Sequence, residues 1–120
     1  MCKMFSGQSP ALYESHTRSI RLGGHATSIR LEAAFWSTLE EIASAQGVSL
    51  PRFLTKLHDE VLDFRGEITN FTSLLRCACL TYAAEVKDRG PAVEALKLEA
   101  KGAFAGLPPR AAGPLHRQDM

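Results

Sequence analysis

The sequence SIRLGGHATSIRL, residues 19–31, contains the tetrapeptide Ser-Ile-Arg-Leu twice, at 19–22 and at 28–31. Polar and apolar residues alternate in each copy, and a period of two is typical of a β-strand with one buried face. Gly23 and Gly24 follow the first copy directly and suit a tight turn. We therefore expect an N-terminal β-hairpin with one apolar and one polar face.

The position of the turn sets the pairing register of this hairpin. A two-residue turn at Gly24 and His25 would give Gly24 the positive φ that a type II′ turn needs at its first central position. In that register Leu22 lies opposite Thr27, and Arg21 lies opposite Ser28. The expected buried face is Ile20, Leu22, Thr27, Ile29 and Leu31, and the expected exposed face is Ser19, Arg21, Ser28 and Arg30.

The pattern becomes helical after residue 32. Phe35, Leu39 and Ile42 follow one helical face, which predicts a first helix over 33–46 that ends at Gly47. Ser49 predicts the N-cap of a second helix, which Gly66 ends. A third helix is expected from about residue 70 to about residue 87. Its segment 74–80 is apolar nearly all round, which favours burial within the chain or between subunits.

The composition excludes several classes of protein. A chain of 120 residues has room for one domain, which excludes a barrel or a complete dinucleotide-binding sheet. No apolar run approaches the roughly 20 residues of a membrane span. The first seven residues lack the apolar core of a secretory signal. Cys2, Cys77 and Cys79 are odd in number, so we expect reduced thiols, with Cys77 and Cys79 buried, in a cytoplasmic protein.

The chain divides into three segments. We expect a flexible arm over 1–17, a folded domain over 18–89, and a short exposed helix at 92–101 within a segment 90–120 that ends in a disordered Pro/Gly/Ala-rich tail. The net charge is only +1, but residues 1–31 hold four basic residues against one acidic residue. The positive charge therefore concentrates ahead of the helices.

The sequence offers no set of residues for catalysis or for a metal ion. Cys77 and Cys79 are two positions apart on the predicted third helix, which turns their side chains about 200° from each other. The four histidines do not pair at helical spacing, and His58, Asp59 and Glu60 spread around a helix surface. We expect neither an enzyme nor a bound cofactor.

The order of these elements resembles the ribbon-helix-helix family, which includes the methionine and Arc repressors. The resemblance rests on Thr27 to Glu32, the helix from Ala33 to Gln46, and Gly-Val-Ser-Leu at 47–50. A wider match over about 18–86 resembles a bacterial subgroup of ribbon-helix-helix domain proteins, and it rests on GGHATSIRLEAAFW, GVSLPRFL and NFTSLLRCACL. The fold implied is mainly α with an N-terminal β-hairpin, a ribbon-helix-helix with an additional third helix, and dimeric.

The resemblance also implies a function, namely sequence-specific binding of double-stranded DNA at a palindromic operator by a homodimer that regulates transcription. Bases would be contacted by Ser28, Arg30 and Arg21, and phosphates by Ser49, Val48 and Arg52. The implied dimer core comprises Ile29, Leu31, Phe35, Leu39, Leu54 and Leu57.

The chain departs from the repressor pattern because it offers two strands where each repressor subunit contributes one. A sheet of four strands would be roughly 14 Å wide between its outer backbones, whereas the major groove is about 12 Å wide. The alternative is therefore a protein-interaction module on the same dimer, which would bind a protein through its sheet or third helix. An antitoxin with a toxin-binding tail is a further alternative.

Overall fold

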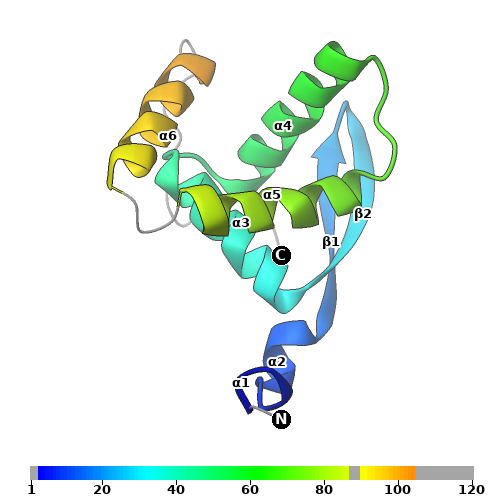
Figure 1. The fold of residues 1–120 in the computed structure, drawn as a ribbon. Helices are drawn as coiled ribbons and strands as arrows, with labels where there is room; N and C mark the ends of the chain where they lie inside the picture. The colour runs from blue at the N-terminus through cyan, green and yellow to red at the C-terminus, as the bar shows by residue number, and fades with distance from the viewer. Residues whose placement is uncertain (1–2, 87–89, 105–120) are drawn as a thin grey trace.

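The computed structural model describes residues 3–86 and 90–104, so the predicted Pro/Gly/Ala-rich tail lies outside the described residues. An N-terminal hairpin precedes a set of packed helices (Figure 1), which confirms the predicted mainly α fold. No helix of the described residues is long and apolar enough to cross a membrane. The elements are α1 (Lys3–Ser6), α2 (Pro10–Tyr13), β1 (Ser15–Leu22), β2 (His25–Glu32), α3 (Ala33–Ala45), α4 (Leu50–Arg65), α5 (Phe71–Glu85) and α6 (Gly90–Ala103).

The hairpin turns at Gly23 and Gly24, one residue earlier than predicted. Both glycines have positive φ, 57° and 84°, the combination of a type I′ turn rather than the expected type II′. Leu22 consequently lies opposite His25, and Ser19 lies opposite Ser28. This register differs from the prediction by two residues, and a shift of two leaves every side chain on its predicted face.

The two faces of the hairpin are as the alternation predicted. Ile20, Leu22, Ile29 and Leu31 are buried, and Thr27 is half-buried. Ser19, Arg21, Ser28 and Arg30 are exposed. The hairpin therefore contributes one side to the core and leaves its polar side to solvent.

The first strand begins at Ser15, inside the segment predicted as an arm. Its extra residues are fixed by α3, because the Trp36 indole N–H donates to the His16 carbonyl at 2.9 Å. The Arg18 guanidinium lies 4.6 Å from the Trp36 ring and meets the Glu40 carboxylate at 2.9 Å. Among the described arm residues before β1, Lys3–Ser6 and Pro10–Tyr13 form the single turns α1 and α2.

The helix ends follow the predicted signals. Gly47 has a φ of 76° just beyond α3, and the Ser49 hydroxyl accepts a hydrogen bond from the Arg52 N–H at the start of α4. Asn70 caps α5 in the same way through the Ser73 N–H. The predicted helix at 92–101 corresponds to α6, but it is not simply exposed, because Ala100 is buried and Leu96 packs against the core.

The hydrophobic core closes within one chain. The hairpin supplies Ile20 and Leu22 from β1, and α5 covers the core with Leu75, Cys79 and Tyr82. Of the predicted dimer core, Ile29, Leu31, Leu39 and Leu54 are buried inside the single chain, and Phe35 and Leu57 pack against them half-buried. Strand β1 and helix α5 complete the core around the four buried residues within one chain, whereas Phe35 and Leu57 keep part of their surface exposed.

The third helix is buried on one side only. Leu75 and Cys79 face α3 and β2, whereas Leu80 is 63% exposed and Cys77 is exposed. The outer side of α5, including Cys77, is thus not buried within the chain, and burial between subunits stays a prediction. The physical reason is that α5 is an outer layer of the fold and has no described element on its far side.

Candidate nucleic-acid interface

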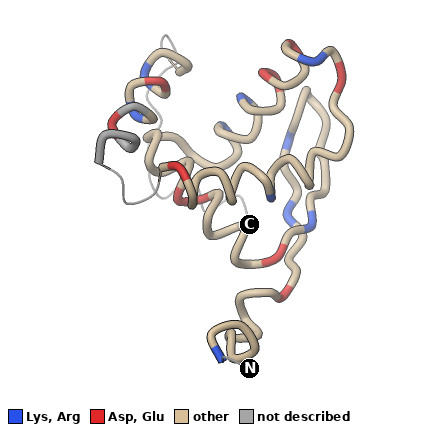
Figure 2. Tube along the Cα trace, in the orientation of Figure 1, with Lys and Arg blue, Asp and Glu red and all other residues tan. Residues whose placement is uncertain are grey.

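The outer face of the hairpin is an exposed polar surface without an acidic residue until the end of β2. The register places Thr17 opposite Arg30, Ser19 opposite Ser28 and Arg21 opposite Ala26. All six side chains are exposed, and we call them the outer face. Figure 2 shows basic residues along the hairpin and acidic ones only near its open end.

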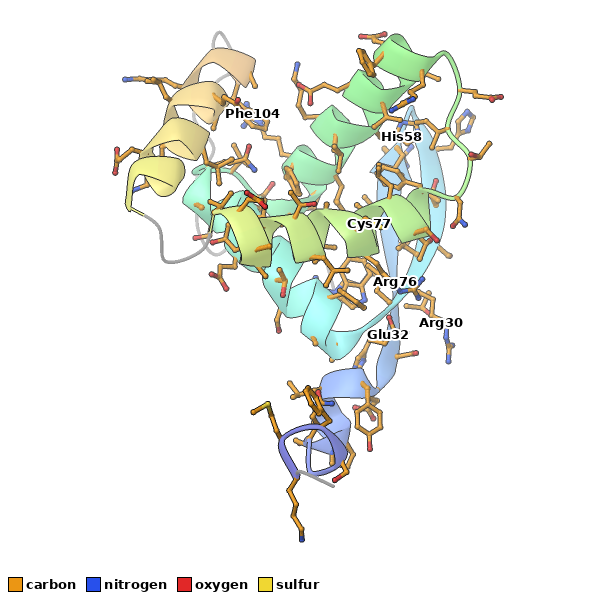
Figure 3. All side chains as sticks on the ribbon, viewed as in Figure 1. Arg30, Glu32, His58, Arg76, Cys77 and Phe104 are labelled. Carbon is orange, nitrogen blue, oxygen red and sulfur yellow. The ribbon has the colours of Figure 1, made fainter. Side chains whose placement is uncertain are left out.

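The two arginines of the outer face are held differently. The Arg21 guanidinium donates to the Gly24 carbonyl at 2.8 Å, so it lies back over the turn. Arg30 makes no hydrogen bond or ion pair with any residue that the structure describes, and Figure 3 shows its side chain pointing away from the fold. Ala26, the partner of Arg21, is four positions before Arg30 on β2, so the two arginines lie about 13 Å apart along the hairpin.

Arg18, although basic and on the same hairpin, does not belong to this surface. Its side chain is only 18% exposed, and it is held between the Glu40 carboxylate and the Trp36 ring on the helical side. Its charge is therefore neutralised within the fold, which leaves Arg21 and Arg30 as the positive charges of the outer face.

The acidic residue next to the outer face is Glu32, the last residue of β2. Its carboxylate accepts two hydrogen bonds from Arg76 of α5, at 3.0 and 3.4 Å (Figure 3). These hydrogen bonds hold the pKa of Glu32 below its usual value, and the positive charges of Arg76 and Arg30 add to the effect. The pairing partly neutralises the Glu32 carboxylate, which would otherwise oppose an anion near Arg30.

Two backbone N–H groups near the start of α4, where a phosphate site is predicted, already have acceptors within the chain. The Val48 N–H donates to the Ala43 carbonyl at 3.1 Å and so belongs to the C-terminal end of α3. The Arg52 N–H donates to the Ser49 hydroxyl oxygen. The Ser49 hydroxyl accepts this hydrogen bond through its oxygen, so its O–H can still donate to a phosphate.

The two edges of the hairpin have different surroundings. The Ala33 N–H donates to the Glu14 carbonyl at 2.8 Å and continues the ladder, so the backbone groups of Ser19 and Arg21 point away from β2. On that side the Thr55 hydroxyl of α4 donates to the Arg21 carbonyl at 3.2 Å. By the same alternation the backbone groups of Ala26, Ser28 and Arg30 point to the outer edge of β2, and the two-stranded sheet leaves that edge unpaired within the described chain.

Sequence reasoning missed Arg76 and Thr55, which fix the two strands from distant helices. Arg76 is the one charged residue within the apolar segment 74–80, and that interruption was the available signal. An unpaired charge in a partly buried apolar segment is energetically costly, so Arg76 is expected to have a carboxylate partner. Which carboxylate it meets, 44 residues away, required the tertiary structure.

No three His, Cys, Asp or Glu side chains gather in a metal-binding arrangement among the residues that the structure describes. The chemistry of the outer face is instead that of hydroxyl groups and guanidinium groups. These groups donate hydrogen bonds to phosphate oxygens and to base edges.

Comparison with known proteins agrees with this arrangement. The family model of the ribbon-helix-helix domain matches residues 15–83, from the start of β1 into α5. A solved structure, that of an uncharacterized protein from Bordetella pertussis Tohama I, is similar to the chain with a TM-score of 0.73 and 38% identity over 89% of each chain. None of the curated proteins matches. Ribbon-helix-helix domains are in general those of DNA-binding regulators that form dimers. The chain belongs to the ribbon-helix-helix domain family.

Proposed function

We propose that the protein is a sequence-specific DNA-binding regulator of transcription that acts as a homodimer in the bacterial cytoplasm. The observation that carries the proposal is the open outer face, on which Arg30 extends into solvent beside Ser28. Neither the N-terminal turns α1 and α2 nor any described helix covers these side chains. A guanidinium group can donate two hydrogen bonds to guanine O6 and N7, and a serine hydroxyl can donate or accept.

The free edge of β2 supports pairing with a second copy about a two-fold axis. Backbone groups of Ala26, Ser28 and Arg30 point outward along this edge. Antiparallel pairing of β2 with its symmetry mate, centred on Ser28 or on Ile29, keeps each outer face on the same side of the sheet. The dimer then presents Ser28 and Arg30 of both subunits in the middle of four strands.

A four-stranded sheet is too wide to lie flat in the major groove, so its twist matters. Neighbouring strands rotate by about 20–25°, which over four strands turns the outer pair well away from the central pair. The β1 strand also stays attached to the helices through Thr55 and Trp36. The two central β2 strands would enter the groove, while the β1 strands lie against its walls.

This geometry gives the arginines separate roles. Arg30, on the central strand, would contact base edges together with Ser28. Arg21, on the outer strand, would leave the Gly24 carbonyl and contact the phosphate backbone. The Ser49 hydroxyl and Arg52 at the start of α4 are the remaining candidates for phosphate contacts.

The test is a selection of genomic fragments by the purified protein at physiological salt, followed by binding measurements on the enriched site. Loss of Arg30 in Arg30→Ala should remove the preference for that site, at a cost of about 1–3 kcal/mol per base contact. Arg21→Ala should weaken binding to all DNA sequences alike. It should also reduce the slope of log K against log salt concentration by about 0.9 per lost phosphate contact.

Arg65→Ala is the matched control, because Arg65 is exposed at the far end of α4 and outside the outer face. It should leave both the preference and the salt slope unchanged. If the dimer enriches no fragment above background, the DNA-binding proposal is wrong and the protein-interaction alternative takes its place.

A further inference from the structure

A cleft with a volume of about 250 Å³ lies between α4 and α6. Figure 1 shows α4 between the hairpin and α6, so the cleft lies on the other side of α4 from the hairpin. Because α6 follows the residues 15–83 that the family model matches, the matched domain forms the cleft together with an element outside it. Pockets for drug-sized ligands have volumes of about 300–1,000 Å³, which favours a smaller molecule here.

The walls of the cleft provide apolar surface from both helices. The apolar lining residues are half-buried and comprise Phe53, Leu57, Ala103 and Phe104. Phe53 and Leu57 also pack against the hydrophobic core, which fixes the α4 wall. On the other wall the Phe104 N–H donates to the Ala100 carbonyl at 2.9 Å, and Figure 3 shows Phe104 on the side of α6 that faces α4. A ligand can therefore bury methylene groups between the two walls.

The charged residues of the cleft have no partners in the part of the chain that the structure describes. Lys56, Glu60 and Glu99 line the cleft, and none of them makes a hydrogen bond or an ion pair with a described residue. Glu94, on the same helix as Glu99, instead forms an ion pair with Lys97 at 3.8 Å. The cleft thus presents one positive and two negative charges to a ligand.

We propose that this cleft binds a basic α-amino acid such as arginine or lysine. Lys56 and Glu60 are four positions apart on one face of α4, with about 5–6 Å between Cβ atoms, so they can bind the α-carboxylate and the α-ammonium group of one molecule. Glu99 on the opposite wall binds the cation at the end of the ligand's side chain. The methylene groups between these charges lie against Phe53 and Phe104, as long basic side chains do on apolar surfaces.

The charge pattern selects this class over simpler ligands. A neutral amino acid leaves Glu99 without a partner, and an amine without a carboxylate leaves Lys56 without one. A basic amino acid carries two positive charges and one negative charge, the complement of the cleft. Because these ion pairs stay partly exposed to water, each should change the dissociation constant by about fivefold.

The experiment is isothermal titration calorimetry of the full chain with L-arginine, L-lysine and two analogues. L-Norleucine, which lacks the side-chain cation, should bind the wild type about fivefold more weakly than L-lysine. Glu99→Gln should remove this difference. Lys56→Met should weaken the binding of L-arginine about fivefold but not that of agmatine, the same molecule without its carboxylate.

Glu94→Gln is the matched control, because it makes the same charge change on α6 outside the cleft. It should leave all four dissociation constants unchanged. Absence of saturable binding of both basic amino acids at millimolar concentration overturns the inference, and so does an equal loss in Glu94→Gln and Glu99→Gln. The titrations contain no DNA, so their outcome is independent of the proposed function.

Discussion

Arg76 on α5 holds the carboxylate of Glu32, the last residue of β2, through two hydrogen bonds: Nε donates to Oε1 at 3.0 Å and Nη2 donates to Oε2 at 3.4 Å. The same guanidinium lies 5.9 Å from the Phe35 ring at the start of α3. One side chain thus connects the end of the hairpin, the first long helix and the additional third helix. The contact also fixes the charge of a carboxylate two residues from Arg30.

The Glu32–Arg76 pair should make stability depend on pH. Because the pKa of Glu32 is lowered in the folded state, the pair stabilises the protein above the ordinary value of 4.5, and this contribution is lost as the pH falls through the folded pKa. In Arg76→Gln the pKa should return toward 4.5, and the urea midpoint should fall at pH 7 and depend less on pH below 5. Arg65→Gln is the control, and an equal pH dependence in Arg76→Gln and the wild type would contradict the prediction.

Alanine substitution should have opposite effects on stability at Gly24 in the turn and at Gly102 in α6. Gly24 has a φ of 84°, while Gly102 lies in α6 without positive φ, and neither has a heavy atom within 4 Å of an added Cβ. Gly24→Ala should therefore lower the free energy of unfolding by about 1 kcal/mol through backbone strain alone. Gly102→Ala should raise the free energy of unfolding by about 0.5–1 kcal/mol because alanine favours a helix. Urea unfolding measures both, and a tolerated Gly24→Ala would show that the turn does not need this conformation.

The third helix should behave as part of the core on one side only. Leu75 is fully buried and Leu80 is 63% exposed on the same helix. Leu75→Ala should cost about 2–5 kcal/mol of unfolding free energy, as truncations in cores do. Leu80→Ala should change it by less than about 0.5 kcal/mol. Similar costs for the two variants would mean that α5 packs differently.

The two cysteines of α5 should differ in reactivity. Burial raises the pKa of Cys79 to about 11, and its thiol lies 3.6 Å from the Phe35 carbonyl, whereas Cys77 is exposed. At pH 8, in a Cys2→Ser background, a thiol reagent should modify Cys77 in the folded protein and reach Cys79 only after unfolding. Mass spectrometry of the labelled chain measures both sites, and rapid labelling of Cys79 would show that α5 opens readily.

The hairpin shows where the sequence was sufficient and where it was not. Alternation sorted Ile20, Leu22, Ile29 and Leu31 onto the buried face, because burial depends on parity alone. It could not distinguish two registers that differ by two residues, and the pair of glycines at 23 and 24 selected the earlier turn. The sequence did not predict that the strand includes His16 and Arg18, because neither residue is apolar. Trp36 and Glu40 of α3 hold these two residues in place.

The candidate site was predictable to the same extent. The outer face followed from the alternation, so Ser28, Arg30 and Arg21 were assigned to it without the structure. The different environments of the arginines depend on the Gly24 carbonyl and on solvent, which only the folded hairpin defines. The hydrogen bond from the Val48 N–H to the Ala43 carbonyl at the end of α3 likewise depends on the folded helix end, which the sequence pattern did not reveal.

The unpaired edge of β2 should be required for dimerisation, and a proline can test each edge of the hairpin separately. Ser19 and Ser28 lie opposite each other, and their N–H groups point to opposite edges of the hairpin, so neither belongs to its own ladder. Proline is tolerated at such edge positions because no intrachain hydrogen bond is lost, but it removes the donor that a second copy would use.

Ser28→Pro should therefore convert the dimer into a folded monomer, whereas Ser19→Pro, on the edge that faces α4, should remain dimeric. Sedimentation equilibrium gives the mass, and circular dichroism checks that both variants retain the helices. A dimeric Ser28→Pro would place the subunit contact elsewhere than the edge of β2. A monomeric Ser19→Pro would place it on the side of β1, because the two substitutions remove the same group from the two strands.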